Sequence, residues 1–209
     1  MKMTIRNSVR GLLFIPLLLA CFALLPAARA VSPAPDGGYA GFNTAEGQSA
    51  LGQAAPGVWN TAIGGFTLNS DISGGTGNTA VGLNALRANT LGDFNSALGV
   101  NALRFNVLGS NNTALGFQAL FVNTGDSNTA VGFNALHSNT TAVQGVAVGQ
   151  GALGSNTTGQ GNVAVGFQAL ASSSAPGVNT FGGNVAIGFA ALASTTGSER
   201  PTTALLAMP

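Results

Sequence analysis

The chain is poor in the residues that usually carry chemistry. In 209 residues it has one lysine (Lys2), one cysteine (Cys21) and one histidine (His137), and only 6% of its residues are charged. An ordinary soluble domain has about 25% charged residues. One cysteine cannot form a disulfide framework or a thiolate metal site, and we expect no Ser-His-Asp or Cys-His set from a single histidine and a single cysteine near the N-terminus. We therefore expect no enzyme activity, no cofactor and no metal site.

The first thirty residues have the pattern of an export signal. Lys2, Arg6 and Arg10 precede an apolar run from Gly11 to Pro26, and Ala28-Arg29-Ala30 places small residues where a signal peptidase cleaves. We predict a signal peptide over residues 1–30 and a protein exported to the extracellular space or to a bacterial cell surface.

Two alternatives to a cleaved signal remain open. A membrane anchor is disfavoured because the apolar run is shorter than the 18 or so residues that a span needs, and the mature chain offers no transmembrane segment. Leu18-Leu19-Ala20-Cys21 resembles a lipoprotein cleavage site, but Phe22 to Leu25 continues the apolar run where a polar tether is usual.

Cleavage after Ala30 would leave three basic and six acidic residues, a net charge of −3. A nucleic-acid partner is not expected, because such proteins cluster lysine and arginine against phosphates. Glycine is frequent, with 31 residues, yet 45% of the chain is hydrophobic. Disordered chains are poor in aliphatic residues, so the composition favours a regular fold.

One unit of about 17 residues recurs nine times and contains the motif A-V-G or a close variant. The motif glycines are Gly47, Gly64, Gly82, Gly99, Gly116, Gly132, Gly149, Gly166 and Gly188. Each is followed four residues later by a leucine: Leu51, Leu68, Leu86, Leu103, Leu120, Leu136, Leu153, Leu170 and Leu192. Such regular repetition predicts stacked units.

The unit is too short for a pair of helices and lacks helical periodicity, so it predicts an all-β fold, a parallel β-solenoid or β-roll of about nine rungs. In T-A-V-G the alternation places Thr79 and Val81 on one face and Ala80 on the other. The second half of the unit predicts a turn and a short polar strand. The motif glycine suits a sharp corner, where φ is positive or backbones approach closely.

Stacking explains why the sequence repeats, because one rung cannot bury enough apolar surface to fold alone. Asparagines recur with the same period and predict two ladders of stacked amides. The first ladder is Asn78, Asn95, Asn112, Asn128, Asn162 and Asn184, and the second is Asn89, Asn106, Asn123, Asn139 and Asn156. We expect a linker over residues 31–42, the β-roll over 43–198 and a tail over 199–209, with Glu46 protecting the first strand from pairing.

A third apolar stripe directly follows the glycines, with Phe117, Phe133, Phe167 and Phe189 among its members. A coil this narrow cannot enclose the valine, leucine and phenylalanine stripes together, so we expect one of them outside. An exposed stripe of that length predicts self-association about a symmetry axis.

The repeats resemble the YadA-like head repeat of trimeric autotransporter adhesins. The family motif N-S-V-A-I-G is echoed by GNVAVG at Gly161 and GNVAIG at Gly183, and the resemblance covers residues 43–193. It implies a left-handed parallel β-roll, a homotrimer, and display outside a bacterial cell for attachment to host or environmental surfaces. The units are longer than the family's usual repeat, and Gly197 to Pro209 is too short for that family's stalk or anchor.

Other motifs have simple explanations. His137 has no partner at metal-ligand spacing. GGTG at Gly74 lacks the lysine of a phosphate loop and the aspartate of a calcium repeat. N-T-T at Asn139 and Asn156 matches a glycosylation acceptor, but Asn-Thr belongs to the repeat.

Function follows from the repeat rather than from a reactive group. We expect a non-enzymatic adhesin-type head that binds a glycan or a matrix protein through many equivalent contacts. Two alternatives remain. One is an ice- or crystal-binding solenoid, disfavoured because the positions after the second ladder (Thr90, Val107, Thr124, Thr140 and Thr157) are not strictly threonine. The other is a fibre or spacer segment with no ligand.

Overall fold

The fold is given by a computed structural model, which describes residues 40–52, 57–70, 75–171, 182–193 and 203–205. The chain divides into two compact units, Met1–Pro35 and Asp36–Pro209, and all described residues belong to the second. Within these residues the regular secondary structure is entirely β. The predicted signal peptide, with Cys21, lies outside the described residues.

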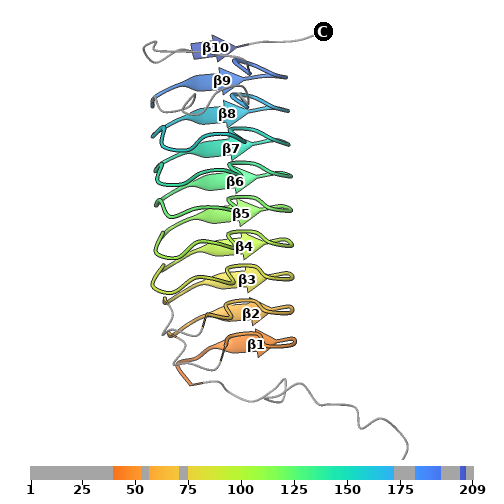
Figure 1. The fold of residues 1–209 in the computed structure, drawn as a ribbon, viewed down its shortest axis with the longest axis vertical. Coiled ribbons are helices and arrows are strands. Elements are labelled where there is room, and N and C mark those ends of the chain that lie inside the picture. Colours follow the sequence, from red (N-terminus) through yellow and green to blue (C-terminus); the bar gives the residue numbers. More distant parts are fainter. Residues whose placement is uncertain (1–39, 53–56, 71–74, 172–181, 194–202, 206–209) are drawn as a thin grey trace, which may run out of the picture. The chain divides into compact units, whose positions relative to one another are not determined.

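Ten three-residue strands form one parallel sheet in sequence order (Figure 1). The strands are β1 Thr44–Glu46, β2 Thr61–Ile63, β3 Thr79–Val81, β4 Ser96–Leu98, β5 Thr113–Leu115, β6 Thr129–Val131, β7 Val146–Val148, β8 Val163–Val165, β9 Val185–Ile187 and β10 Thr203–Leu205. Equivalent residues pair across neighbouring strands, for example Ala80 with Ala97 and Ala97 with Ala114. The predicted parallel β-solenoid is confirmed.

The apolar core is made of alanine and leucine. The central alanine of each described rung from Ala45 to Ala186 is buried, while the residues on either side of it point outward. The leucines from Leu51 to Leu170 are buried beside a second alanine column, which includes Ala102 and Ala119. The interior therefore holds two alanines and one leucine per turn, as Ala97, Ala102 and Leu103 show, which leaves no room for the other apolar stripes.

The motif glycines form one corner of the rung, here called the glycine corner. Their φ angles lie between +121 and +138°, a region that side-chain-bearing residues rarely adopt. A Cβ on Gly116 would also lie 2.5 Å from the carbonyl oxygen of Gly132 in the next rung. Positive φ and close backbone approach coincide at this corner, so both reasons for glycine apply.

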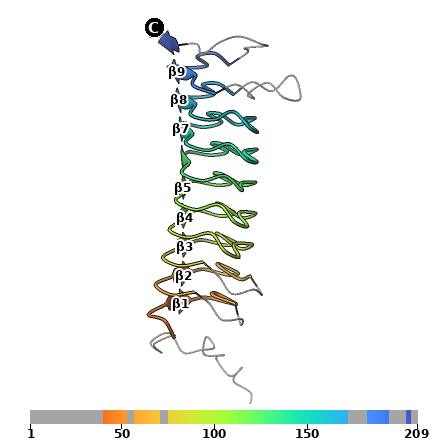
Figure 2. The same ribbon diagram turned by 90° about the vertical axis from the view of Figure 1, so that its left-hand side faces the viewer.

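The return half of the rung is not a strand in the described residues, which corrects the expected second polar strand. Each motif leucine has a positive φ, between 43 and 61°, which is unusual for a bulky residue. The turn aims the leucine inward, while its N–H donates to the next rung, as Leu86 does to the Ala102 carbonyl at 3.0 Å. The strands lie along one side of the stack and the return segments along the other (Figure 2).

Two asparagine ladders close the opposite corner, here called the asparagine corner. In the first ladder Asn112 N–H donates to Asn95 Oδ1 at 3.0 Å, and in the second Asn123 Nδ2 donates to Asn106 Oδ1 at 2.9 Å. Asn112 and Asn123 also both donate to the Gly125 carbonyl, at 2.9 and 2.8 Å. Buried amides thus link each rung to the next and to its own turn, and the predicted ladders are confirmed.

The sheet extends into the segment that the sequence assigned to a tail after Ser198. Thr203–Leu205 (β10) pairs in parallel with β9, with Ala204 opposite Ala186. The sequence signal for this strand is T-A-L, as in β5, but Leu206 stands where the glycine is expected. The expectation that the pattern stops after Ser198 is therefore wrong for these three residues. The long insertion over 172–181 lies outside the described residues.

Candidate functional surface

The outer face of the sheet carries a continuous aliphatic column at the third position of each strand. Its members are Ile63, Val81, Leu98, Leu115, Val131, Val148, Val165 and Ile187. All are outside the core, with Leu98 50% exposed and Val148 37% exposed. The first rung has Glu46 instead, opposite Ile63, so the column begins at β2.

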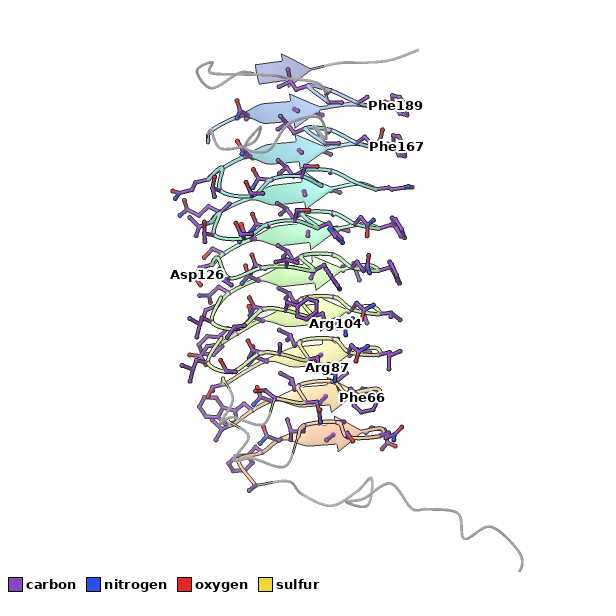
Figure 3. The ribbon with its side chains drawn as sticks, viewed as in Figure 1. Phe66, Arg87, Arg104, Asp126, Phe167 and Phe189 are labelled. Carbon is purple, nitrogen blue, oxygen red and sulfur yellow. The ribbon has the colours of Figure 1, made fainter. Side chains whose placement is uncertain are left out.

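A second apolar column lies immediately across the glycine corner. It consists of Leu83, Val100, Phe117, Phe133, Phe167 and Phe189, with Gln150 as an interruption. Phe117 stacks on Phe133 with ring centroids 5.3 Å apart, and Phe167 stacks on Phe189 at 5.1 Å. Figure 3 shows the Phe167 and Phe189 rings at the corner opposite Asp126.

These two columns together are called the apolar patch. Only the motif glycine separates them in sequence, and both are outside the core. The expectation that one stripe lies outside is therefore corrected: the leucines are inside, and two stripes are outside. Within its eight rungs, β2 to β9, the patch contains no charged residue. Soluble monomers seldom expose a contiguous apolar surface of this extent.

The residue type at the first position of each strand changes along the sheet, from hydroxyl side chains to valine. Thr44, Thr61, Thr79, Ser96, Thr113 and Thr129 form a column of hydroxyl side chains over β1 to β6. Val146, Val163 and Val185 continue the column over β7 to β9. This column was not predicted, because a threonine array was expected only after the second asparagine ladder, although T-A-V and T-A-L already contain the signal for it.

A mixed column of arginine and aromatic residues follows the return side, five residues after the glycine. It contains Arg87, Arg104, Phe121 and His137 on four consecutive rungs. The Arg104 guanidinium carbon lies 4.9 Å from the centroid of Phe105 and 6.0 Å from that of Phe121. The repeat pattern alone does not show which rings the arginines cover, because these contacts depend on the turns of the return segment.

His137 belongs to this column. Its ring stacks on Phe121 at 5.1 Å, and Nδ1 lies 3.3 Å from Ser138 Oγ. Partial burial lowers its pKa, so the ring is neutral at physiological pH. In the described part of the chain, no group of three His, Cys, Asp or Glu residues could hold a metal ion.

The remaining motifs are parts of the asparagine corner. Asn139 and Asn156 are fully buried in the second ladder, where a glycan could not be attached. In GGTG, the Gly75 carbonyl accepts from Asn60 Nδ2 at 2.9 Å, as the corner carbonyls of later rungs do. Gly74 itself lies outside the described residues.

Comparison with known proteins adds no assignment. No family model, curated protein or solved structure matches the chain. Across the described ranges, no helix is long and apolar enough to span a membrane. Functional inference for this chain therefore rests on its surface geometry.

Proposed function

We propose that the chain is a non-enzymatic, exported head module of the adhesin type, which self-associates and mediates attachment. The observation that carries this proposal is the apolar patch. Burying an aliphatic side chain stabilises by roughly 1.5–3 kcal/mol, and a patch that repeats over eight rungs offers many such side chains to a second copy. The resemblance to trimeric adhesin heads supports a homotrimer as the assembly.

Absence of charge supports the same conclusion. A symmetric interface brings each residue close to its own copies, so a charged side chain near the axis would repel itself. The sole acidic residue on the outer sheet face of the described strands, Glu46, lies in the first rung, β1. Copies of the patch can therefore meet without like-charge repulsion.

Sedimentation equilibrium of the purified chain tests this assembly, with two valines as a matched pair. Val148 lies in the patch and is 37% exposed, while Val122 lies on the return side and is 36% exposed. We expect three times the chain mass for the parent protein and for Val122→Asp, and the mass of one chain for Val148→Asp. A monomeric parent, or equal masses for both variants, would overturn the assembly.

Attachment is tested by coating beads with the chain and measuring their retention on glycan and matrix-protein surfaces under flow. We expect retention above that of albumin-coated beads. Beads that bind none of the surfaces would instead support a fibre or spacer segment without a ligand.

Ice or crystal binding is the second candidate, favoured by the in-register column from Thr44 to Thr129. Strands of one sheet lie about 4.8 Å apart, so the hydroxyls form a regular row. The row ends where Val146 replaces threonine, and an aliphatic column adjoins it, which makes attachment the better proposal. Thermal hysteresis that disappears in Thr113→Glu would reverse this order.

A further inference from the structure

The described arginines occur together on the return side of the stack. Arg87 and Arg104 occupy the same repeat position on consecutive rungs, and Phe121 and His137 continue that column. Figure 3 shows both arginines away from the corner that carries Asp126. The backbones that carry them lie about 4.8 Å apart along the stack, and like charges on adjacent rungs destabilise each other.

The protein supplies no anion to these arginines within the described residues. Arg87 is 5.5 Å from the Phe66 ring and has one long contact, from Nη1 to Asn84 Oδ1 at 3.5 Å. The corner carboxylates are occupied elsewhere, because Asp93 accepts from Thr76 N–H at 2.6 Å and Asp126 accepts from Ser110 N–H at 2.7 Å.

Aromatic rings fix the direction of the Arg104 guanidinium. Its Cζ lies 4.9 Å from the centroid of the Phe105 ring, and its Nε is buried without a hydrogen-bond partner. The terminal amino groups are not buried in this way, so they remain as the donors available to a ligand. A planar guanidinium donates two parallel hydrogen bonds to a carboxylate or sulfate group, which a lysine ammonium cannot match.

Beside the cations lies a row of partly exposed rings. Phe105 contacts Phe121 edge to face at 5.0 Å, and Phe121 stacks on His137 at 5.1 Å. Rings of this kind provide an apolar surface against which the C–H face of a pyranose can pack. One acidic sugar could therefore place its oxyanion at the arginines and pack its ring against the aromatic side chains.

We infer that Arg87, Arg104, Phe105, Phe121 and His137 form a binding site for an acidic glycan, with guanidinium groups holding a carboxylate or sulfate and the rings packing against the sugar. This inference deepens the proposed attachment function and rests on it for its biological role. The site lies on the return side, whereas the apolar patch covers the sheet face and the glycine corner. In an oligomer, repeated copies of the site would strengthen attachment to a polymeric glycan.

Fluorescence anisotropy with labelled oligosaccharides tests the ligand class on the purified chain. The probes are a hyaluronan tetrasaccharide, which carries carboxylates, a heparin-derived tetrasaccharide, which also carries sulfates, and neutral chitotetraose. We expect at least one acidic probe to bind about tenfold more tightly than chitotetraose, with an affinity that falls as salt rises from about 50 to about 300 mM. Binding of only one acidic probe identifies the preferred oxyanion, and equal binding of all three overturns the inference.

Substitutions locate the site. Arg104→Gln should weaken acidic binding about tenfold, and Arg104→Lys should weaken it less, since charge remains but the planar fork is lost. The matched control is Thr158→Glu, which changes the net charge by the same amount at an exposed position of the asparagine corner. A loss in Thr158→Glu equal to that in Arg104→Gln would show a general charge effect and overturn the site.

The outcomes separate this site from the assembly. A monomer that binds acidic sugar through Arg104 would overturn self-association and retain the site. A trimer that binds neither acidic probe would overturn the site and retain the assembly. Circular dichroism of each variant verifies that the sheet is intact.

Discussion

The two corners of each rung differ in the length variation that they accept. From the first asparagine ladder to the second, the distance across the glycine corner is always 11 residues, as in 78–89, 95–106 and 112–123. Across the asparagine corner the distance is 6 residues in 89–95 but 5 in 123–128. The small changes in unit length among these rungs therefore fall at one corner only.

The glycine corner is rigid because backbone contacts backbone there. A Cβ added to Gly99 would lie 2.5 Å from the Gly116 carbonyl oxygen, and the same distance separates a Cβ on Gly116 from the oxygen of Gly132. No side chain lies between the motif glycines of neighbouring rungs, so none can adjust its rotamer if the backbone moves. The number of residues at this corner is therefore the same in each of these rungs.

The asparagine corner adapts because side chains close it. Asn89 Nδ2 donates to the carbonyl three residues ahead, Gly92, at 2.9 Å, while Asn123 Nδ2 donates to the carbonyl two residues ahead, Gly125, at 2.8 Å. The same buried bond forms across turns of different length. Backbone packing thus fixes one corner, and amide side chains allow variation at the other.

Deleting one residue at each corner should give the largest contrast. Loss of Leu91 converts N-T-L-G-D-F-N into N-T-G-D-F-N, which matches N-T-G-D-S-N of the rung at Asn123, so we expect a change within about 1 kcal/mol. Loss of Leu83 would displace Leu86 from the core and break the bond from Asn84 N–H to the Gly65 carbonyl, costing more than about 4 kcal/mol.

Urea unfolding followed by the fluorescence of Trp59, the only tryptophan, measures both deletions. Circular dichroism verifies that the parent and the Leu91 deletion have the same sheet content. Equal losses of stability in the two deletions would show that the corners do not differ.

Gly116→Ala is expected to have the next largest effect. Its φ of +138° and the contact with the next rung together should cost about 3 kcal/mol or more. The control is Gly151→Asn, which has φ +67° and whose Cβ would make only an ordinary van der Waals contact, 3.5 Å from Gln168 Cγ. Because Asn134 occupies the same place one rung earlier, the control should change stability by less than about 1 kcal/mol. Thermal unfolding compares the two, and a tolerated Gly116→Ala would contradict the account of the corner.

Asn112→Ala should destabilise by about 2–4 kcal/mol. It removes the donor to the Gly125 carbonyl and the acceptor for Asn128 N–H, which are both buried. Asn101→Gly is the control, since Asn101 is at the glycine corner, has φ +60° and accepts one partly buried hydrogen bond, from Asn84 Nδ2 to its Oδ1 at 3.2 Å. We expect a loss of about 0.5 kcal/mol or less for the control in urea. Similar losses would mean that the buried ladder contributes no more than a surface amide.

Much of the fold could be predicted because the same residue types recur at the same positions of each rung. The alternation in T-A-V placed alanine on the face opposite threonine and valine, and the period of Asn112 and its equivalents predicted the ladders. The positive φ of Leu86 could not be predicted, since leucine avoids that conformation by itself. The stack imposes it, because the leucine must enter the core while its N–H bonds to the next rung.

The candidate surface was less predictable than the core. A sequence shows which residues share a repeat position, as Arg87, Arg104, Phe121 and His137 do. It does not show that Arg104 covers Phe105, since that contact depends on the turns of the return segment. The repeat predicted three apolar columns. It did not predict that only the leucines are buried, because that depends on the volume inside each rung.

The smallest expected effect comes from repairing a natural gap in the first ladder. Gly145 stands where neighbouring rungs have asparagine, and its N–H donates to Asn128 Oδ1 at 2.9 Å. Gly145→Asn should stabilise the fold by about 1 kcal/mol, because it restores a buried amide and removes the entropic cost of glycine. A Cβ there would lie 3.1 Å from Asn128 Oδ1 and 3.5 Å from Leu136 Cδ1, so a small shift is needed. Gly145→Ala supplies the Cβ without the amide and should gain less. If both variants lose the same stability in urea, the asparagine corner of this rung cannot accept the added side chain, and the predicted gain is wrong.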